Sequence, residues 1–118
     1  MLIGHQGERP VVAQSAYIAP TAVLCGEVTV GADARILFGA VISADGGAVE
    51  LGADTVVMEN AVVRGRERHP TSIDDHVLIG PHAHVNGDVI ERDVFIATGA
   101  SIFRAHGSAP AARSASTR

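Results

Sequence analysis

The sequence predicts an all-β fold in which short strands wind into a parallel coil. Branched aliphatic residues recur at every sixth position, a period that belongs to neither an α-helix nor a single strand. A second, small or β-branched residue usually follows four positions later. Two inward residues per six predict a three-sided tube, with about 18 residues per turn and turns about 4.8 Å apart. A β-sandwich of short strands is the alternative, but strand alternation alone would not hold this period along the chain.

The two inward positions can be assigned throughout the chain. The glycines that follow some aliphatic residues, such as Gly31, Gly52 and Gly80, predict corners that need a positive φ or a close approach of two backbones. The aliphatic residues are Ile18, Leu24, Val30, Ile36, Ile42, Leu51, Val57, Val63, Ile73, Ile79, Val85, Ile90, Ile96 and Ile102, with one five-residue step after Val85. The second set is Ala22, Val28, Ala34, Ala40, Thr55, Ala61, Val77, Ala83, Val94 and Ala100.

These repeats predict one domain over residues 1–104 and a disordered tail over 105–118. The tail is rich in Ala, Ser and Arg and lacks the aliphatic period. We expect the last coil to lie open, in a natural short form or after truncation or a frame change. Because a coil has open ends and a narrow core, it needs protected ends or partners, and we expect an oligomer.

Composition excludes several classes of function. The formal net charge of −4 and the nine cations, all arginine and scattered, argue against a nucleic-acid partner. The start of the chain lacks the pattern of a signal peptide, and no run approaches the roughly 20 apolar residues that span a bilayer. We therefore expect a cytoplasmic protein with no membrane partner. Cys25 is the only cysteine, and we expect a packing thiol there.

Two segments interrupt the six-residue period and are predicted to be loops. The first lies between Ile42 and Leu51 and contains residues 43–47. The second lies between Val63 and Ile73 and contains residues 64–71, with three of the nine arginines. The second loop is either simply solvated or forms the rim of a site for a small anion.

Four segments resemble the γ-class carbonic anhydrases, a branch of the hexapeptide-repeat proteins. They are residues 20–31, 37–41, 59–63 and 77–80, and the resemblance covers roughly residues 10 to 104. It implies a left-handed β-helix that assembles as a homotrimer. In that family, three histidines from neighbouring subunits hold a zinc ion that hydrates carbon dioxide.

The residues at the family's three ligand positions differ from the family pattern. Arg64 follows Asn60–Val63 where the first histidine is expected, and Pro81 and Asn86 stand at the second and third positions. Catalytic zinc normally takes three protein ligands from His, Cys or carboxylate side chains. Proline has no such donor and arginine stays protonated, so we expect no zinc at this site.

The residues that support the family's site differ as well. Ser43 stands where the family has an arginine, although the aspartate of that motif remains as Asp45. Met58 replaces a glutamine that helps to orient the substrate or the zinc-bound hydroxide, and Glu59 replaces an aspartate. Loss of the ligands together with their supporting residues favours a discarded zinc chemistry.

Three classes of function remain open. The first is a trimeric subunit without a cofactor that binds a small anionic ligand or acts in assembly. The second is an acyltransferase that uses a CoA thioester, with His82, His84 or His69 as general base. The third is a carbonic anhydrase with rearranged ligands. In the first class, a pocket at the subunit boundary is predicted to be lined by Arg64, Met58, Asn86, His84, Arg66 and Arg68.

The third class needs new metal ligands. His82 and His84 lie beside the expected ligand positions, should face outward, and could bind a metal if His69 or His76 of a neighbouring subunit completed the set. Asp45 and Glu59 would then either support the metal ligands or transfer protons. Alternatively, His82 and His84 are surface or interface histidines.

Overall fold

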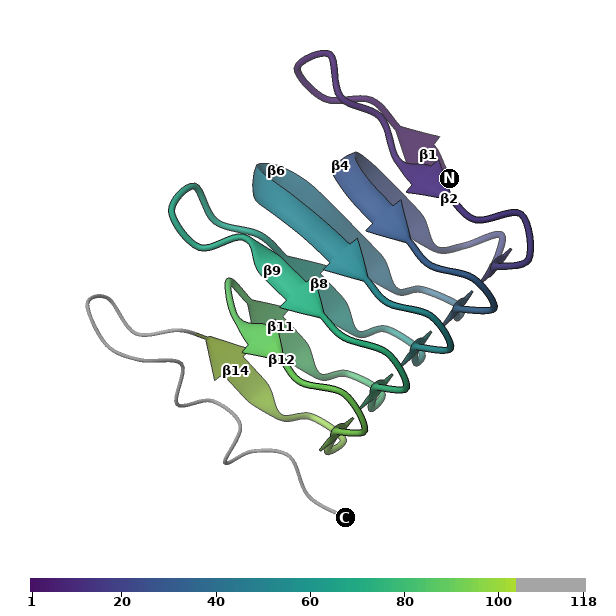
Figure 1. Cartoon of the computed structure of the whole chain (residues 1–118), viewed down its shortest axis with the longest axis vertical. Helices are drawn as coiled ribbons and strands as arrows, with labels where there is room; N and C mark the ends of the chain where they lie inside the picture. Colours follow the sequence, from purple (N-terminus) through teal and green to yellow (C-terminus); the bar gives the residue numbers. More distant parts are fainter. Residues whose placement is uncertain (104–118) are drawn as a thin grey trace.

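The computed structural model describes residues 1–103, and the tail predicted over 105–118 lies outside them. Within 1–103 the chain is all β, as predicted, and winds through about five turns of a parallel β-helix. The coil winds in the left-handed sense (Figure 1). The strands are β1 (Leu2–Ile3), β2 (Val11–Val12), β3 (Tyr17–Ile18), β4 (Val23–Val30), β5 (Arg35–Ile36), β6 (Val41–Leu51), β7 (Val56–Val57), β8 (Val62–Arg64), β9 (Thr71–Ile73), β10 (Leu78–Ile79), β11 (His84–Asn86), β12 (Val89–Ile90), β13 (Phe95–Ile96) and β14 (Ser101–Phe103).

The strands form three faces. The first face contains β1, the first halves of β4 and β6, and then β8, β11 and β14. The second face contains β2, the second halves of β4 and β6, and then β9 and β12. The third face contains β3, β5, β7, β10 and β13. The chain passes from the first face to the second and third in every turn, so three corners run along the molecule (Figure 1).

The core consists of stacked aliphatic side chains, as the six-residue period predicts. On the first face Leu24, Ile42, Val63, Val85 and Ile102 are partners in adjacent strands, and all are buried. Equivalent rows run along the other two faces. Each such side chain contributes about 1.5–3 kcal/mol when buried. The core is therefore a narrow line of branched side chains.

The glycines that follow the aliphatic residues, Gly31, Gly52 and Gly80, allow close packing of two backbones and do not have a positive φ. A methyl group added at Gly31 would lie 2.7 Å from the carbonyl carbon of Gly52. The positive φ angles fall two residues later, on non-glycine residues such as Asp33, Asp54 and His76, at the corner between the second and third faces. Of the two roles predicted for these glycines, close approach is the correct one.

The two interruptions of the period have different structures. Residues 43–47 were predicted to form a loop, which is wrong, because β6 continues through them as it bends from the first face onto the second. The second interruption is a loop, closed by backbone hydrogen bonds in both directions between Arg66 and His69. We call residues 64–69 the arginine hairpin. It projects from the corner between the first and second faces, on the same side as a turn closed by His5 and Glu8 (Figure 1).

Candidate functional site

The candidate site lies at the end of the first face, beside the corner with the second face. Ser43, Arg64 and Asn86 occupy successive strands in the same register, so their side chains form one outward row. Adjacent parallel strands lie about 4.8 Å apart. Arg64 and Asn86, two of the three positions that the resemblance assigns to zinc ligands, are therefore neighbours.

Arg64 is held by an acidic partner from the neighbouring turn. Its Nη2 atom lies 3.5 Å from Oδ2 of Asp45, and the two side chains are 44% and 45% exposed. Ser43 donates a hydrogen bond of 3.0 Å from its hydroxyl to Oδ1 of Asp45. This hydrogen bond, and then the positive charge of Arg64, hold the pKa of Asp45 below its usual range. Asp45 is thus kept ionised and steadies the guanidinium of Arg64.

The backbone beneath this row is tied together by a buried hydroxyl. Thr71 is 1% exposed and takes the inward position that Val28 and Val49 take in the two preceding turns. Its hydroxyl donates to the carbonyl oxygen of Arg64 and accepts from the backbone N–H of Gly87 at 2.8 Å and of Asp88 at 3.3 Å. One side chain thus joins the strand ends that bear Arg64 and Asn86.

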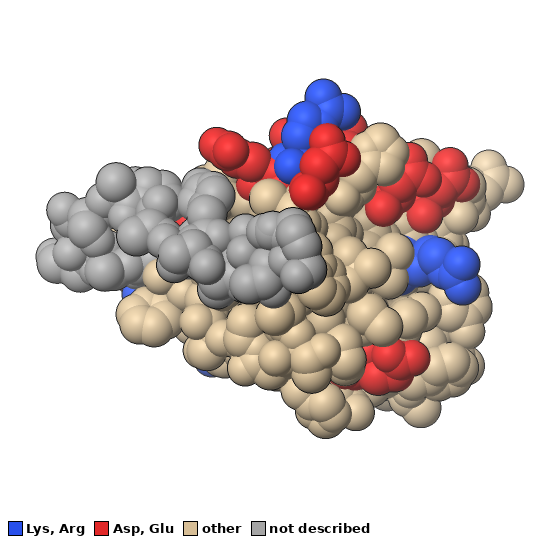
Figure 2. Space-filling model, turned by 90° about the horizontal axis from the view of Figure 1, so that it is seen from below, with Lys and Arg blue, Asp and Glu red and all other residues tan. Residues whose placement is uncertain are grey.

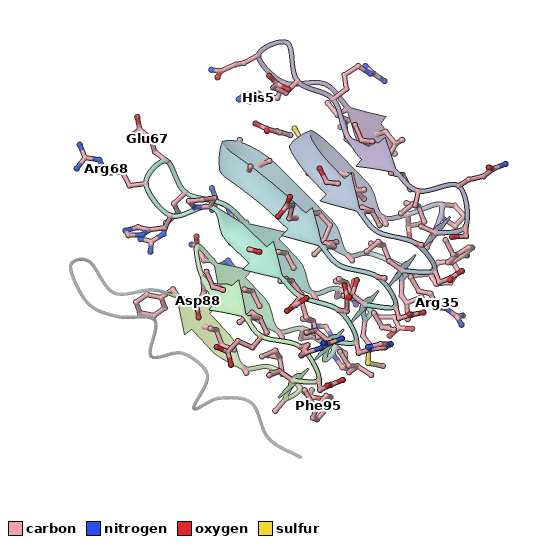
Figure 3. The ribbon with its side chains drawn as sticks, in the orientation of Figure 1. His5, Arg35, Glu67, Arg68, Asp88 and Phe95 are labelled. Atoms are coloured by element: carbon pink, nitrogen blue, oxygen red, sulfur yellow. The ribbon has the colours of Figure 1, made fainter. Side chains whose placement is uncertain are left out.

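The arginine hairpin packs over the same corner. A methyl group added at Gly87, whose φ is +69°, would lie 2.7 Å from Nε of Arg66 and 3.0 Å from Cβ of His69. Arg66 therefore lies against the turn that follows Asn86. Glu67 and Arg68 stand at the tip of the hairpin and point away from the body of the coil (Figure 3). The structure brings Arg64, Asn86 and Arg66 together at this corner and leaves Arg68 outside it.

The remaining predicted residues lie elsewhere. Met58, Glu59, Pro81 and His82 gather at the corner between the third and first faces, where the N–H of His82 donates to the carbonyl oxygen of Glu59 at 3.0 Å. His84 lies on the first face and faces outward, as predicted, although its Nε2 atom is buried and has no hydrogen-bond partner in the described part of the chain. Pro81 precedes strand β11 and Asn86 ends it, so the two stand at opposite edges of the first face. Only a neighbouring subunit could bring a second Pro81 or Met58 to Arg64.

Within residues 1–103 the histidines do not converge on one site. His76 lies at the corner between the second and third faces, with Nε2 3.3 Å from Asp54 and Nδ1 3.9 Å from Asp93. His82 is exposed at a different corner and adopts a φ of +61°. Among residues 1–103, no three His, Cys, Asp or Glu side chains are grouped so as to hold a metal ion.

Sequence reasoning did not identify two polar residues inside the coil, Thr71 and Asp88. Asp88 is fully buried; its Oδ1 accepts from the N–H of Val89 at 2.8 Å, and its Oδ2 has no hydrogen-bond partner among residues 1–103. Both residues stand two positions before a second-face aliphatic, Ile73 or Ile90, where Val28 and Val49 stand in earlier turns. A comparison of these equivalent positions would have identified them.

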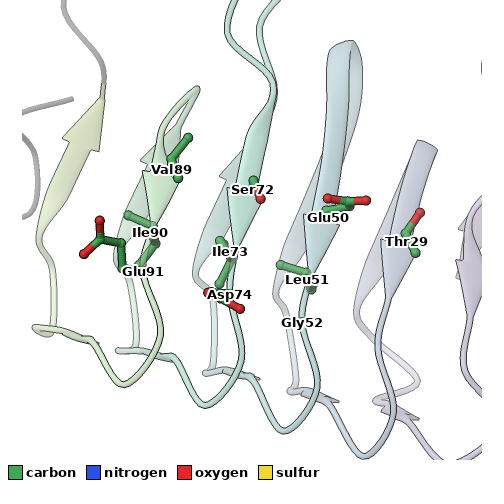
Figure 4. Close-up of a pocket in the computed structure, with 10 residues that line it drawn as sticks. All are labelled: Thr29, Glu50, Leu51, Gly52, Ser72, Ile73, Asp74, Val89, Ile90 and Glu91. Carbon is green, nitrogen blue, oxygen red and sulfur yellow. The ribbon is translucent and has the colours of Figure 1, made fainter. Parts of the chain in front are cut away.

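Hollows on the surface of residues 1–103 lie away from the predicted pocket residues. A groove of about 420 Å³ runs across the second face, over Thr29, Glu50, Ser72 and Val89 (Figure 4). A hollow of about 280 Å³ lies between the first turn and the bend of β6, where Asp45 reaches its wall, and a smaller one of about 170 Å³ adjoins the groove. A pocket at Arg64 would need a further wall, which residues 1–103 of one chain do not supply.

Charge is distributed unevenly around the coil. Acidic side chains gather where the second face meets the third, and a broad uncharged area lies beside them (Figure 2). The outward row of the third face consists of Tyr17, Arg35, Val56, Leu78 and Phe95. On the first face, the outward row beside Arg64 begins with Val23, Val41 and Val62, all half-buried. The first and third faces thus carry mostly apolar outward rows, whereas the acidic side chains gather at the corner between the second and third faces.

Comparison with solved structures shows the same fold. A putative acetyltransferase from Bacillus cereus matches with a TM-score of 0.62 at 20% identity, covering 86% of this chain and 73% of that one. A hexapeptide transferase family protein from Anaplasma phagocytophilum matches with a TM-score of 0.59 at 21% identity, covering 86% and 74%. The chain therefore shares the β-helix fold of these two proteins.

Sequence comparison identifies the relatives of the chain, although no protein-family model matches it. Gamma carbonic anhydrase 1, mitochondrial, of Arabidopsis thaliana is 33% identical over 99 residues, covering 79% of this chain and 36% of that protein. A probable carbonic anhydrase of Methanocaldococcus jannaschii is 32% identical over 92 residues, covering 78% and 58%. The chain is a homologue of the γ-class carbonic anhydrases. It spans about two fifths of the length of the plant relatives.

Location in the cell stays a prediction. Within residues 1–103 there is no helix that could cross a membrane. The plant relatives are named mitochondrial, so the expected cytoplasmic location has no support from them.

Proposed function

We propose that this chain is a γ-carbonic anhydrase-like subunit that binds a small anion at a subunit boundary, in place of zinc. The observation that carries the proposal is the pairing of Arg64 with Asn86 on adjacent strands, at two positions that the resemblance gives to metal ligands. A guanidinium is a fixed cation with several hydrogen-bond donors and suits a carboxylate or phosphate. An anion bound there would take the place of a metal-bound hydroxide, so the proposed function is binding of a ligand rather than hydration of carbon dioxide.

The residues at the family's ligand positions do not fit zinc. The Arg64 guanidinium, already paired with Asp45, would place a positive charge beside a divalent ion. At an effective dielectric constant of 20, a charge pair of +1 and +2 at 4 Å repels by roughly 8 kcal/mol. Pro81 offers no side-chain donor, and an amide such as Asn86 is a poor zinc ligand. No step of the proposed function passes through a metal ion.

The subunit boundary is proposed to cross the first face. A trimer follows from the resemblance, and the apolar outward row of Val23, Val41 and Val62 beside Arg64 supports burial of this face. Head-to-tail contacts that close a ring would bring the corner with Met58 and Pro81 of one subunit against Arg64 of the next. That contact would supply the wall that one chain lacks.

Anion binding is tested by titration of acetate, benzoate and inorganic phosphate into the purified protein, followed by calorimetry and NMR. We expect at least one of these anions to bind, and Arg64→Ala to weaken it at least tenfold, which corresponds to about 1.4 kcal/mol. Arg35→Ala is the matched control, since Arg35 is an exposed arginine on a strand of the third face. Equal affinity in the wild type and Arg64→Ala would refute the site.

The other two functions are outcomes of parallel measurements. Binding of acetyl-CoA that depends on His82 or His84 would support the acyltransferase. Hydration of carbon dioxide that depends on a metal held by these histidines would support the rearranged carbonic anhydrase. Either result would replace the anion-binding proposal.

A further inference from the structure

The corner beneath the candidate site contains a buried polar group where the coil otherwise uses an apolar one. The inward positions at this corner read Val28, Val49, Thr71 and Asp88 in successive turns. Thr71 and Asp88 are 1% and 0% exposed. Burial of a hydroxyl is favourable only when its hydrogen bonds are made, and Thr71 makes three.

Each of these three hydrogen bonds ends on a backbone group next to the site. The carbonyl oxygen that Thr71 contacts belongs to Arg64 itself, and the N–H of Gly87 directly follows Asn86. Gly87 has a second tie, from its N–H to the Arg64 carbonyl oxygen at 3.0 Å. For the N–H of Asp88, the hydroxyl of Thr71 is the acceptor found within residues 1–103, at 3.3 Å.

We infer that Thr71 is a positioning residue for the anion site, and this inference rests on the proposed function. Its hydroxyl sets the placement of the Arg64 and Asn86 strand ends relative to each other, across the place where the arginine hairpin leaves the coil. Valine, which fits the same position in two earlier turns, lacks the hydroxyl. Thr71→Val would keep the packing of the core and release the strand ends.

The test compares four proteins in the full chain: wild type, Thr71→Val, Thr71→Ser and Thr55→Val. Thr71→Ser keeps the hydroxyl. Thr55→Val is the matched control, because Thr55 is also fully buried but donates its hydrogen bond to Gly52, away from the site. The first measurement is amide hydrogen exchange at Asp88. The second is the affinity for the anion that binds the wild type most tightly.

In Thr71→Val we expect exchange at the Asp88 amide to accelerate at least tenfold and anion affinity to fall at least fivefold. Thr71→Ser should restore both, and Thr55→Val should change neither. Unchanged exchange at Asp88 in folded Thr71→Val, or equal loss of affinity in Thr55→Val, would overturn the inference. If the wild type binds no anion, the proposed function fails; the exchange measurement still decides whether Thr71 holds the strand ends. Should Thr71→Val not fold, Thr71→Ala with the same measurements replaces it.

Discussion

At the scale of single residues, short-range polar contacts determine the pKa of Asp45 at the candidate site. Asp45 accepts from Ser43 and pairs with Arg64, and these contacts lower its pKa. A carboxyl group with a depressed pKa stabilises the folded state above its usual pKa, and this contribution is lost as the pH falls through the folded-state pKa. The pH window of this effect therefore lies below about pH 4.

Ser43→Ala should raise the pKa of Asp45 towards its usual range, because the hydroxyl of Ser43 is the largest cause of the depression. NMR titration of the Asp45 carboxyl carbon measures this shift. Ser15→Ala is the control, since Ser15 accepts from the N–H of Asp33, in another part of the coil. An unchanged titration in Ser43→Ala would contradict the assigned hydrogen bond.

Asp88→Asn should raise the free energy of unfolding at pH 7 by about 1–2 kcal/mol. The change replaces a buried ionisable group, whose Oδ2 has no partner among the described residues, by a neutral amide and keeps an oxygen to accept from Val89, and an uncompensated buried charge is costly. Urea unfolding monitored by circular dichroism measures the difference. A loss of similar size would mean that the carboxylate is stabilised by a partner.

At the scale of elements, the period of six predicted which side chains face inward and which strands are partners. Leu24, Ile42 and Val63 form one buried row as expected, because the repeat fixes the register. The continuity of β6 could not be predicted, because the residues that interrupt the period also bend with the strand. The positive φ of Asp33 and Asp54 was not predicted, because a positive φ was assigned to the glycine two residues earlier.

The same limit applies to the candidate site. The adjacency of Arg64 and Asn86 follows from register and was implicit in the sequence. The separation of Met58 from Arg64 by the width of the first face was not, because a list of residues at a subunit boundary does not say which subunit supplies each. Thr71 and Asp88 were not predicted to be buried, because the six-residue period is defined by aliphatic residues and these two are polar residues at equivalent inward positions.

Gly47 and Gly65 bring two stretches of backbone into tight packing at the arginine hairpin. A methyl group at Gly65 would meet the carbonyl oxygen of Gly47 and lie 2.6 Å from that of Ala48. We expect Gly65→Ala to destabilise the fold by about 2–4 kcal/mol. Gly99→Ala, where φ is +72° and nothing lies within 4 Å, should cost only about 1 kcal/mol. Thermal unfolding of the two variants checks the order, and the reverse order would contradict the packing.

At the scale of the whole molecule, the narrow core leaves several large apolar side chains exposed, such as Val11, Tyr17 and Val89, and the proposed trimer would bury part of the apolar surface. Lysine at an apolar interface must bury its charge, so we expect Val41→Lys on the first face to raise the dissociation constant of the trimer roughly a hundredfold. Thr29→Lys, on the second face, should leave assembly unchanged. Sedimentation equilibrium distinguishes these outcomes. A wild type that stays monomeric over a roughly 100-fold range of protein concentration would contradict the assembly proposal.

The register of the coil also gives the most direct test of the central proposal, that Arg64, Pro81 and Asn86 stand at the positions that the resemblance assigns to zinc ligands and do not bind zinc. The measurement is zinc content per chain after dialysis against zinc, for the wild type and for Arg64→His combined with Pro81→His and Asn86→His. The account predicts less than about 0.1 zinc per wild-type chain and close to one in the triple variant. Stoichiometric zinc in the wild type, or a folded trimeric triple variant that takes up none, would contradict it.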